Sequence, residues 1–175
     1  MKSRKVICAV LAAAMMTTMA FASCGDDSSS DAPTSSASTT AVETKEKTAK
    51  DITAIANSLK DSLDDDVKGT MVEYDASRID KIIGVKEDLY SKAVCMVDAS
   101  GASAHEIDCF EAKDENSAKE IETALKTRID NQKNAFKDYV PAEMDKLNDP
   151  VLVVDGNYVI MCLSNNNSKA KEIIG

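Results

Sequence analysis

The stretch VLVVDGNYVIMCL, residues 151–163, decides the fold of this chain. Two apolar, largely β-branched runs, 151–154 and 158–163, flank Asp155, Gly156 and Asn157. Asp-Gly between two such runs is a strong hairpin signal, because a type I′ turn requires positive φ at both central residues. The stretch therefore predicts two antiparallel strands joined by a tight turn.

A second hairpin is expected immediately upstream. Residues 89–97 and 104–112 are strand-like and are separated by the turn-rich segment DASGAS. In the second run Glu106 and Asp108 alternate with Ile107 and Cys109. This alternation is typical of an antiparallel sheet with one covered face, so we expect the two acids to lie on a solvent-exposed face.

The longest helix is expected over residues 115–139, with Asp114 as its N-cap and Val140-Pro141 ending it. Asn131 and Gln132 interrupt its apolar stripe, which indicates looser packing of its C-terminal part. Shorter helices are expected over 52–63, with Asp51 as N-cap, over 77–83 and over 168–174, and a short strand is expected over 71–74. The element order predicts an α+β domain: a mostly antiparallel sheet of about four to five strands with helices packed on one face.

The N-terminus has the features of an export signal. Lys2, Arg4 and Lys5 precede an uncharged apolar run over residues 6–22. Small residues then lead directly into Cys24, and this junction resembles the lipobox of bacterial lipoproteins. The resemblance implies that residues 1–23 are a signal peptide and that the Cys24 sulfur takes a diacylglyceryl group, as in palmitate-carrying lipoproteins. Plain secretion and a retained signal anchor are the alternatives.

Two acyl chains hold a protein stably on a bilayer, whereas one holds it only marginally. Lipid on Cys24 therefore makes the membrane a partner and places the protein on the extracytoplasmic face of the cell membrane. Residues 24–50 are rich in Ser, Thr and Ala, and we expect a disordered tether there. Residues 51–175 then form a single domain.

The acidic charge excludes one class of partner. The chain has a formal net charge of −9, which becomes −12 without residues 1–23, since 18 basic residues then face 30 acidic ones. Nucleic-acid binding needs a basic surface, so no nucleic-acid partner is expected.

No metal or cofactor site is expected either. Asp64, Asp66, Gly69 and Asp75 echo the spacing of a calcium-binding EF-hand loop. However, Lys68 occupies a position where an oxygen ligand is required. Motifs for phosphate binding, metalloprotease activity and serine hydrolysis are absent from the sequence.

His105 is the single histidine of the chain, and it precedes Cys109 by four residues. On a strand these side chains lie about 13 Å apart, too far for a catalytic dyad. We expect His105 on the sheet surface, and a partnership across strands with Cys95 stays open. Cys95, Cys109 and Cys162 are expected to be buried thiols. A Cys95–Cys109 cross-strand disulfide is the alternative.

Several short motifs resemble an uncharacterised family of Gram-positive lipoproteins that share the domain of unknown function 4358. The motifs are Glu106-Ile107, Phe110, Lys113-Asp114, Gln132, Tyr139-x-Pro141 and Val153-Val154-x-Gly156-Asn157-Tyr158-Val159. The resemblance covers roughly residues 51–174. It implies surface display in an anaerobic Gram-positive bacterium, a reducing habitat that favours free thiols, and no known activity or catalytic residue.

The leading functional hypothesis is a membrane-anchored, non-enzymatic lipoprotein that binds or scaffolds an envelope protein or peptide. The expected partner surface consists of Tyr139, Pro141, Asp155, Gly156, Asn157 and Tyr158, whose simpler role is packing. One alternative is an envelope- or sugar-directed hydrolase, which predicts a cleft with two perturbed acids. Another is a small-ligand receptor, which needs an enclosed apolar pocket.

Overall fold

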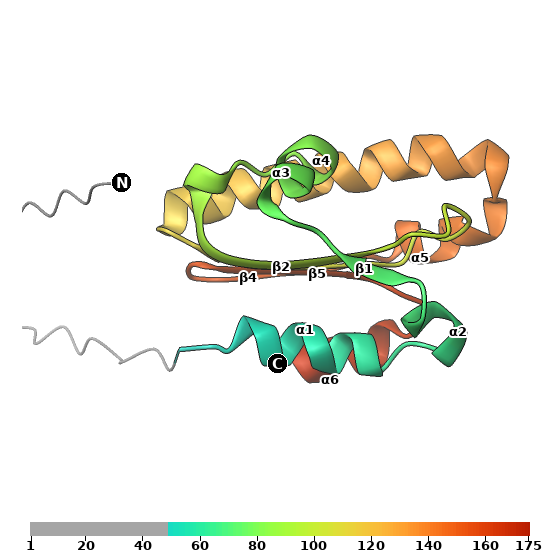
Figure 1. The fold of residues 1–175 in the computed structure, drawn as a ribbon, viewed down its shortest axis with the longest axis horizontal. Coiled ribbons are helices and arrows are strands. Elements are labelled where there is room, and N and C mark those ends of the chain that lie inside the picture. Colours follow the sequence, from blue (N-terminus) through green and yellow to red (C-terminus); the bar gives the residue numbers. More distant parts are fainter. Residues whose placement is uncertain (1–48) are drawn as a thin grey trace, which may run out of the picture. The chain divides into compact units, whose positions relative to one another are not determined.

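The computed structural model describes residues 49–175. The expected signal peptide, Cys24 and nearly all of the expected tether lie outside the described residues. Five strands form one antiparallel sheet in the order β1-β2-β3-β5-β4 (Figure 1). Their bounds are Met71–Glu73 for β1, Tyr90–Asp98 for β2, Glu106–Ala112 for β3, Val151–Asp155 for β4 and Tyr158–Leu163 for β5.

Six α-helices accompany the sheet in the described part of the chain. They are α1 (Ile52–Asp61), α2 (Asp65–Lys68), α3 (Ala76–Arg78), α4 (Glu115–Tyr139), α5 (Met144–Asn148) and α6 (Asn167–Ile174). A π-helical turn, Ile79–Ile83, continues α3, and 3₁₀ turns occur at Glu87–Leu89 and Pro141–Glu143. The predicted α+β class, the antiparallel sheet and both hairpins are confirmed.

Helix starts follow the local capping rules that the sequence suggested. The Asp51 side chain accepts hydrogen bonds from the backbone N–H groups of Thr53 and Ala54, which caps α1. The Asp114 side chain accepts a hydrogen bond from the N–H of Ser117, which caps α4. Both are N-caps because a side-chain oxygen satisfies amide groups that have no partner within the helix.

The helices cover both faces of the sheet, so the expectation of helices on one face was wrong. Helices α1 and α6 lie against one face, and α4 crosses the other together with α3 (Figure 1). The central strands explain this arrangement. On β5, Ile160 and Cys162 pack toward α1 while Val159 and Met161 pack toward α4, and all four are buried. A strand that is apolar on both sides requires cover on both sides.

The tight turn between β4 and β5 lies one residue later than the Asp-Gly prediction. Asp155 pairs with Tyr158 in the ladder, so Gly156 and Asn157 form the two-residue loop. Gly156 has a φ of 61°, a left-handed conformation that glycine adopts without steric cost. The hairpin prediction therefore holds, and its turn is centred on Gly-Asn because Asp155 completes the strand pairing.

Candidate binding cleft

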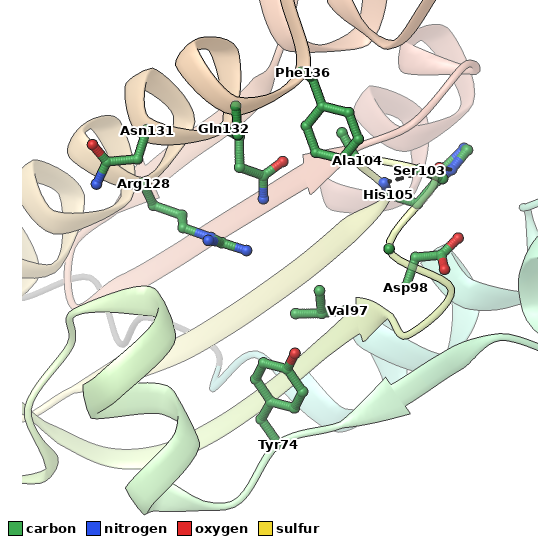
Figure 2. A pocket seen from close by; sticks show the side chains of 12 residues that line it. Tyr74, Val97, Asp98, Ser103, Ala104, His105, Arg128, Asn131, Gln132 and Phe136 are labelled. Atoms are coloured by element: carbon green, nitrogen blue, oxygen red, sulfur yellow. Dashed lines mark hydrogen bonds between the residues drawn. The ribbon is translucent and has the colours of Figure 1, made fainter. Parts of the chain in front are cut away.

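A cleft of about 270 Å³ opens between α4 and the end of the sheet where β2 ends and β3 begins (Figure 2). Side chains from α4 form one wall, and Tyr74, just after β1, reaches toward them from the opposite side. The lining residues that carry the following argument are Tyr74, Val97, Ala104, Arg128, Gln132 and Phe136. The cleft is thus built from segments far apart in the sequence.

A buried carboxylate, Glu106, lies beneath this cleft. Arg128 Nε donates to both carboxylate oxygens at 3.1 and 3.2 Å, and Arg128 Nη2 donates to Oε2 at 2.8 Å. Gln132 Nε2 also donates to Oε2. Glu106 is fully buried, and the Arg128 side chain is 18% exposed. Two residues one helical turn apart on α4 therefore hold one acid of β3.

The same contact fixes the orientation of the Gln132 amide. Its NH₂ group faces Glu106, because turning the amide over would set its oxygen against a carboxylate. Gln132 is 5% exposed, and its Oε1 is buried without a hydrogen-bond partner among the described residues. The residue lines the cleft, and its side chain reaches from α4 toward it (Figure 2). The wall of the cleft therefore contains a buried acceptor with no donor among the described residues.

Arg128 has donors left over. A guanidinium carries five N–H groups, and the contacts with Glu106 use only its Nε side and Nη2. Burial works against the charged form of Arg128, but the hydrogen bond and the negative charge of Glu106 outweigh it and raise its pKa. The cationic side chain lines the cleft beside Gln132 (Figure 2). Its outer edge can therefore donate to a bound group.

The expectation that Glu106 and Asp108 face solvent was wrong, because both are fully buried under α4. Neither oxygen of Asp108 has a hydrogen-bond partner among the described residues. Burial, and then the nearby charge of Glu106, raise the pKa of Asp108 well above its ordinary value. A protonated, neutral Asp108 is the form that such a site favours.

His105 is also buried, at 4% exposed, so the prediction of a strand-surface histidine was wrong. Its Nδ1 lies 2.5 Å from Ser103 Oγ and 3.3 Å from Lys146 Nζ. Glu143 Oε2 accepts from Lys146 Nζ at 2.7 Å and from the Ala104 N–H at 2.6 Å. This polar cluster ties the start of β3 to α5 and to the turn before it.

Burial and the neighbouring Lys146 favour a neutral histidine. Burial, followed by the positive charge of Lys146, lowers the pKa of His105. Burial alone would raise the pKa of Glu143, but hydrogen bonds from the Ala104 N–H and Lys146 lower it overall. His105 lies opposite Asp98 in the sheet, since the Asp98 N–H donates to the His105 carbonyl, whereas Cys95 pairs with Asp108. No His105–Cys95 pair forms.

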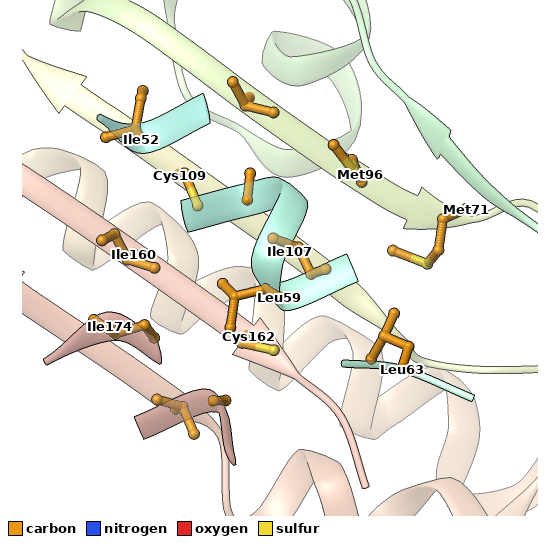
Figure 3. Close-up of a cluster of buried hydrophobic side chains, with 14 of the residues drawn as sticks. Ile52, Leu59, Leu63, Met71, Met96, Ile107, Cys109, Ile160, Cys162 and Ile174 are labelled. Atoms are coloured by element: carbon orange, nitrogen blue, oxygen red, sulfur yellow. The ribbon is translucent and has the colours of Figure 1, made fainter. Parts of the chain in front are cut away.

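The three cysteines of the described domain are buried and free, as predicted. Cys109 and Cys162 lie in the core beneath α1 (Figure 3), whereas Cys95 lies in the core on the α4 face. The alternative Cys95–Cys109 disulfide was therefore wrong, because the two thiols point to opposite faces. Burial raises the pKa of all three thiols, that of Cys162 to about 11.

The residues expected to form one partner surface divide into two groups. Tyr139, at the end of α4, is 73% exposed, and Pro141 begins the following 3₁₀ turn. The Asp155–Tyr158 hairpin turn lies at the opposite end of the sheet, near the start of α4 (Figure 1). There Asn157 bonds the backbone of Ala112, and Tyr158 is 6% exposed. The two groups do not form one continuous lip.

The residues that build the cleft had only a faint signal in the sequence. Gln132 was visible as an interruption of the α4 stripe, four residues after Arg128. Looser packing was the expected result, but Gln132 is buried because Glu106 offers it an acceptor. An Arg-x-x-x-Gln spacing on a helix can be searched for in a sequence. The sequence does not say which strand acid the two side chains contact.

The described residues contain no group of three or more His, Cys, Asp or Glu side chains arranged to hold a metal ion. Over the same residues, no helix combines the length and apolar character that a membrane span requires.

Comparison with known proteins assigns this chain to a protein family. A family model described as a domain of unknown function, DUF4358, matches residues 64–164, more than half of the chain. The match includes β1 to β5 and α4, and therefore the whole cleft wall. No curated protein and no solved structure matches the chain. The chain belongs to the DUF4358 family.

Proposed function

We propose that this protein is a membrane-anchored surface lipoprotein whose domain binds an envelope partner through the cleft on the α4 face. The observation that carries the proposal is Gln132, which lines the cleft and whose buried Oε1 has no donor among the described residues. Leaving a buried polar atom unpaired costs about 1–3 kcal/mol. A ligand N–H that reaches Oε1 would remove that cost, so the unpaired atom favours binding.

The cleft fits part of a larger partner better than a whole small molecule. Its volume of about 270 Å³ is below the range of roughly 300–1,000 Å³ that is usual for pockets enclosing small ligands. Its lining is mixed, with Val97, Ala104 and Phe136 beside Arg128 and Gln132. These features support a segment that projects from a partner more than they support an enclosing apolar receptor.

A hydrolase based on two carboxylates has less support. Asp98 is the one acid among the described residues that line the cleft. Glu106 is paired with Arg128, and Asp108 lies beside it on the same strand, so these acids do not face each other across a substrate space. Glycosidase carboxyl groups must flank the bond that is cut. The geometry therefore favours binding over hydrolysis.

The anchor is the second part of the proposal. Cys24 follows an export-like segment in a lipobox-like position, and a charge of −12 after residue 23 disfavours contact of the domain with anionic lipid. Fractionation of Cys24→Ala tests the anchor directly. We expect the variant to leave the membrane fraction, and retention at the wild-type level would contradict lipidation.

Site-specific photocrosslinking in intact cells tests the cleft. A photoreactive amino acid at Asn131, an exposed position that lines the cleft, should crosslink an envelope component. The same amino acid at Asn134, exposed on the same helix and not lining the cleft, is the matched control. Equal crosslinking from both positions, or none from Asn131, would reject the cleft as the binding site.

A further inference from the structure

Arg128 and Gln132 line the cleft and carry complementary hydrogen-bonding groups. Gln132 offers an acceptor, because its Oε1 is unpaired and its amide cannot turn over. Arg128 offers donors from the guanidinium edge that Glu106 does not use. The two residues are one turn apart on α4, so their side chains are neighbours, with Cβ atoms about 5–6 Å apart. A ligand must therefore supply a donor and an acceptor side by side.

An extended peptide supplies this pair. In an extended chain, one residue directs its own N–H and C=O to the same side, as in a hydrogen-bonded pair of antiparallel strands. We propose that the cleft binds a peptide segment, one residue of which donates its N–H to Gln132 Oε1 and accepts a hydrogen bond from Arg128 through its C=O. This inference rests on the proposed function and specifies the ligand of the same cleft.

The charges favour a neutral backbone group over a free carboxylate. The positive charge of Arg128 is already balanced by Glu106. This carboxylate is fully buried and contacts the edge of the guanidinium that faces away from the ligand. A ligand carboxylate would add a second anion to this pair, in a domain that is acidic overall. A peptide carbonyl uses the same donors without adding charge.

An apolar part of the cleft wall can receive an aliphatic side chain. Val97, Ala104 and Phe136 line the cleft beside the polar pair. The Tyr74 ring already has the guanidinium of Arg78 over it, 5.6 Å from its centroid, which takes up one of its stacking faces. Phe136 is the other aromatic residue of the lining, and a leucine-like side chain needs only apolar contact with it. The peptide residue is therefore expected to be aliphatic.

Titration of the mature protein, labelled with ¹⁵N, provides the test. The probe is N-acetyl-leucine-N′-methylamide, which carries one leucine flanked by two amides. N-acetylglucosamine, with a single amide, and free leucine, with a carboxylate and an ammonium, are the comparison ligands. We expect saturable shifts of the Arg128, Gln132 and Phe136 amide resonances with the blocked leucine, and binding at least tenfold weaker with the other two.

Variants assign the contacts. Gln132→Met keeps the side-chain length but removes the acceptor, and Arg128→Lys keeps the charge but removes the guanidinium edge. Each should weaken binding of the blocked leucine by about five- to tenfold. Glu122→Gln, also on α4 but not lining the cleft, should leave binding unchanged. Unchanged affinity in a folded Gln132→Met protein would overturn the assignment.

If the variants fail to fold, the titrations of the wild-type protein still test the proposal. Preference for N-acetylglucosamine or free leucine, or no saturable shift with the blocked leucine, would reject a peptide ligand. The Asn131 crosslinking result separates this failure from that of the proposed function. A crosslink that persists while the peptide probe fails leaves the cleft as a binding site and rejects only the ligand class.

Discussion

Arg128 of α4 and Glu106 of β3 form a two-point ion pair beneath the cleft, with Nη2 to Oε2 at 2.8 Å and Nε to Oε1 at 3.1 Å. They are 22 residues apart in the chain, and Glu106 is fully buried. The pair ties α4 to β3 beside the apolar packing of Leu125 and Ile129, and it holds the Arg128 side chain at the cleft. One contact therefore links the helix to the strand beneath it and orients a residue of the cleft wall.

Glu106→Gln should destabilise the domain strongly. Removing one partner of a buried ion pair leaves the other charge uncompensated and costs about 3–5 kcal/mol. Urea denaturation followed by circular dichroism measures the loss. Glu122→Gln, which removes the partly exposed i,i+4 partner of Lys126, should cost no more than about 1 kcal/mol. Similar losses in the two variants would contradict a structural role for the Glu106 pair.

Asp108 should make the domain less stable as pH rises. Its folded-state pKa is raised, so its contribution is fully present below the ordinary value of 3.8 and is lost as pH rises toward the folded pKa. Asp108→Asn mimics the neutral acid and should lose part of this pH dependence. The measurement is the free energy of unfolding from pH 4 to pH 8 for both proteins. An Asn variant with the wild-type slope would show that Asp108 ionises freely.

His105 should have the opposite effect at mildly acidic pH. Its folded-state pKa is lowered from 6.5, so the unfolded chain takes up the proton first. Its contribution is present above pH 6.5 and is lost as pH falls through the folded pKa. Because His105 is the single histidine, its ¹H–¹⁵N resonances report the titration directly. A measured pKa at or above 6.5 would contradict the burial beside Lys146.

The thiols of Cys95, Cys109 and Cys162 should resist alkylation in the native protein. All three are buried and their pKa values are raised, so the reactive thiolate is both rare and inaccessible. Iodoacetamide labelling followed by peptide mass spectrometry should find them unmodified at pH 8 and fully modified in urea. Rapid native labelling of Cys95 alone would mean that the α4 face opens.

Elements governed by neighbouring residues were predicted well. The α4 bounds, the Asp51 and Asp114 caps and both hairpins agree with the structure, because capping and strand alternation act over a few residues. The cover of the second sheet face was missed. The alternation of polar and apolar residues from Glu106 to Cys109 does not tell a solvent-exposed sheet face from a covered one. The same pattern occurs when the polar side contacts a helix that carries Arg128.

The sequence by itself determined the strands, their hairpins, the capped helices α1 and α4 and the helix α6, and it predicted the export-like segment that ends at Cys24, since each depends on local chemistry. The short helices α2 and α5 were not predicted. Only the tertiary structure decided which acids are buried and which polar atoms stay unpaired. Glu106, Arg128 and Gln132 meet because α4 returns across the sheet after β3. Hydrogen bonding between distant segments depends on that packing, and no short stretch of sequence records it.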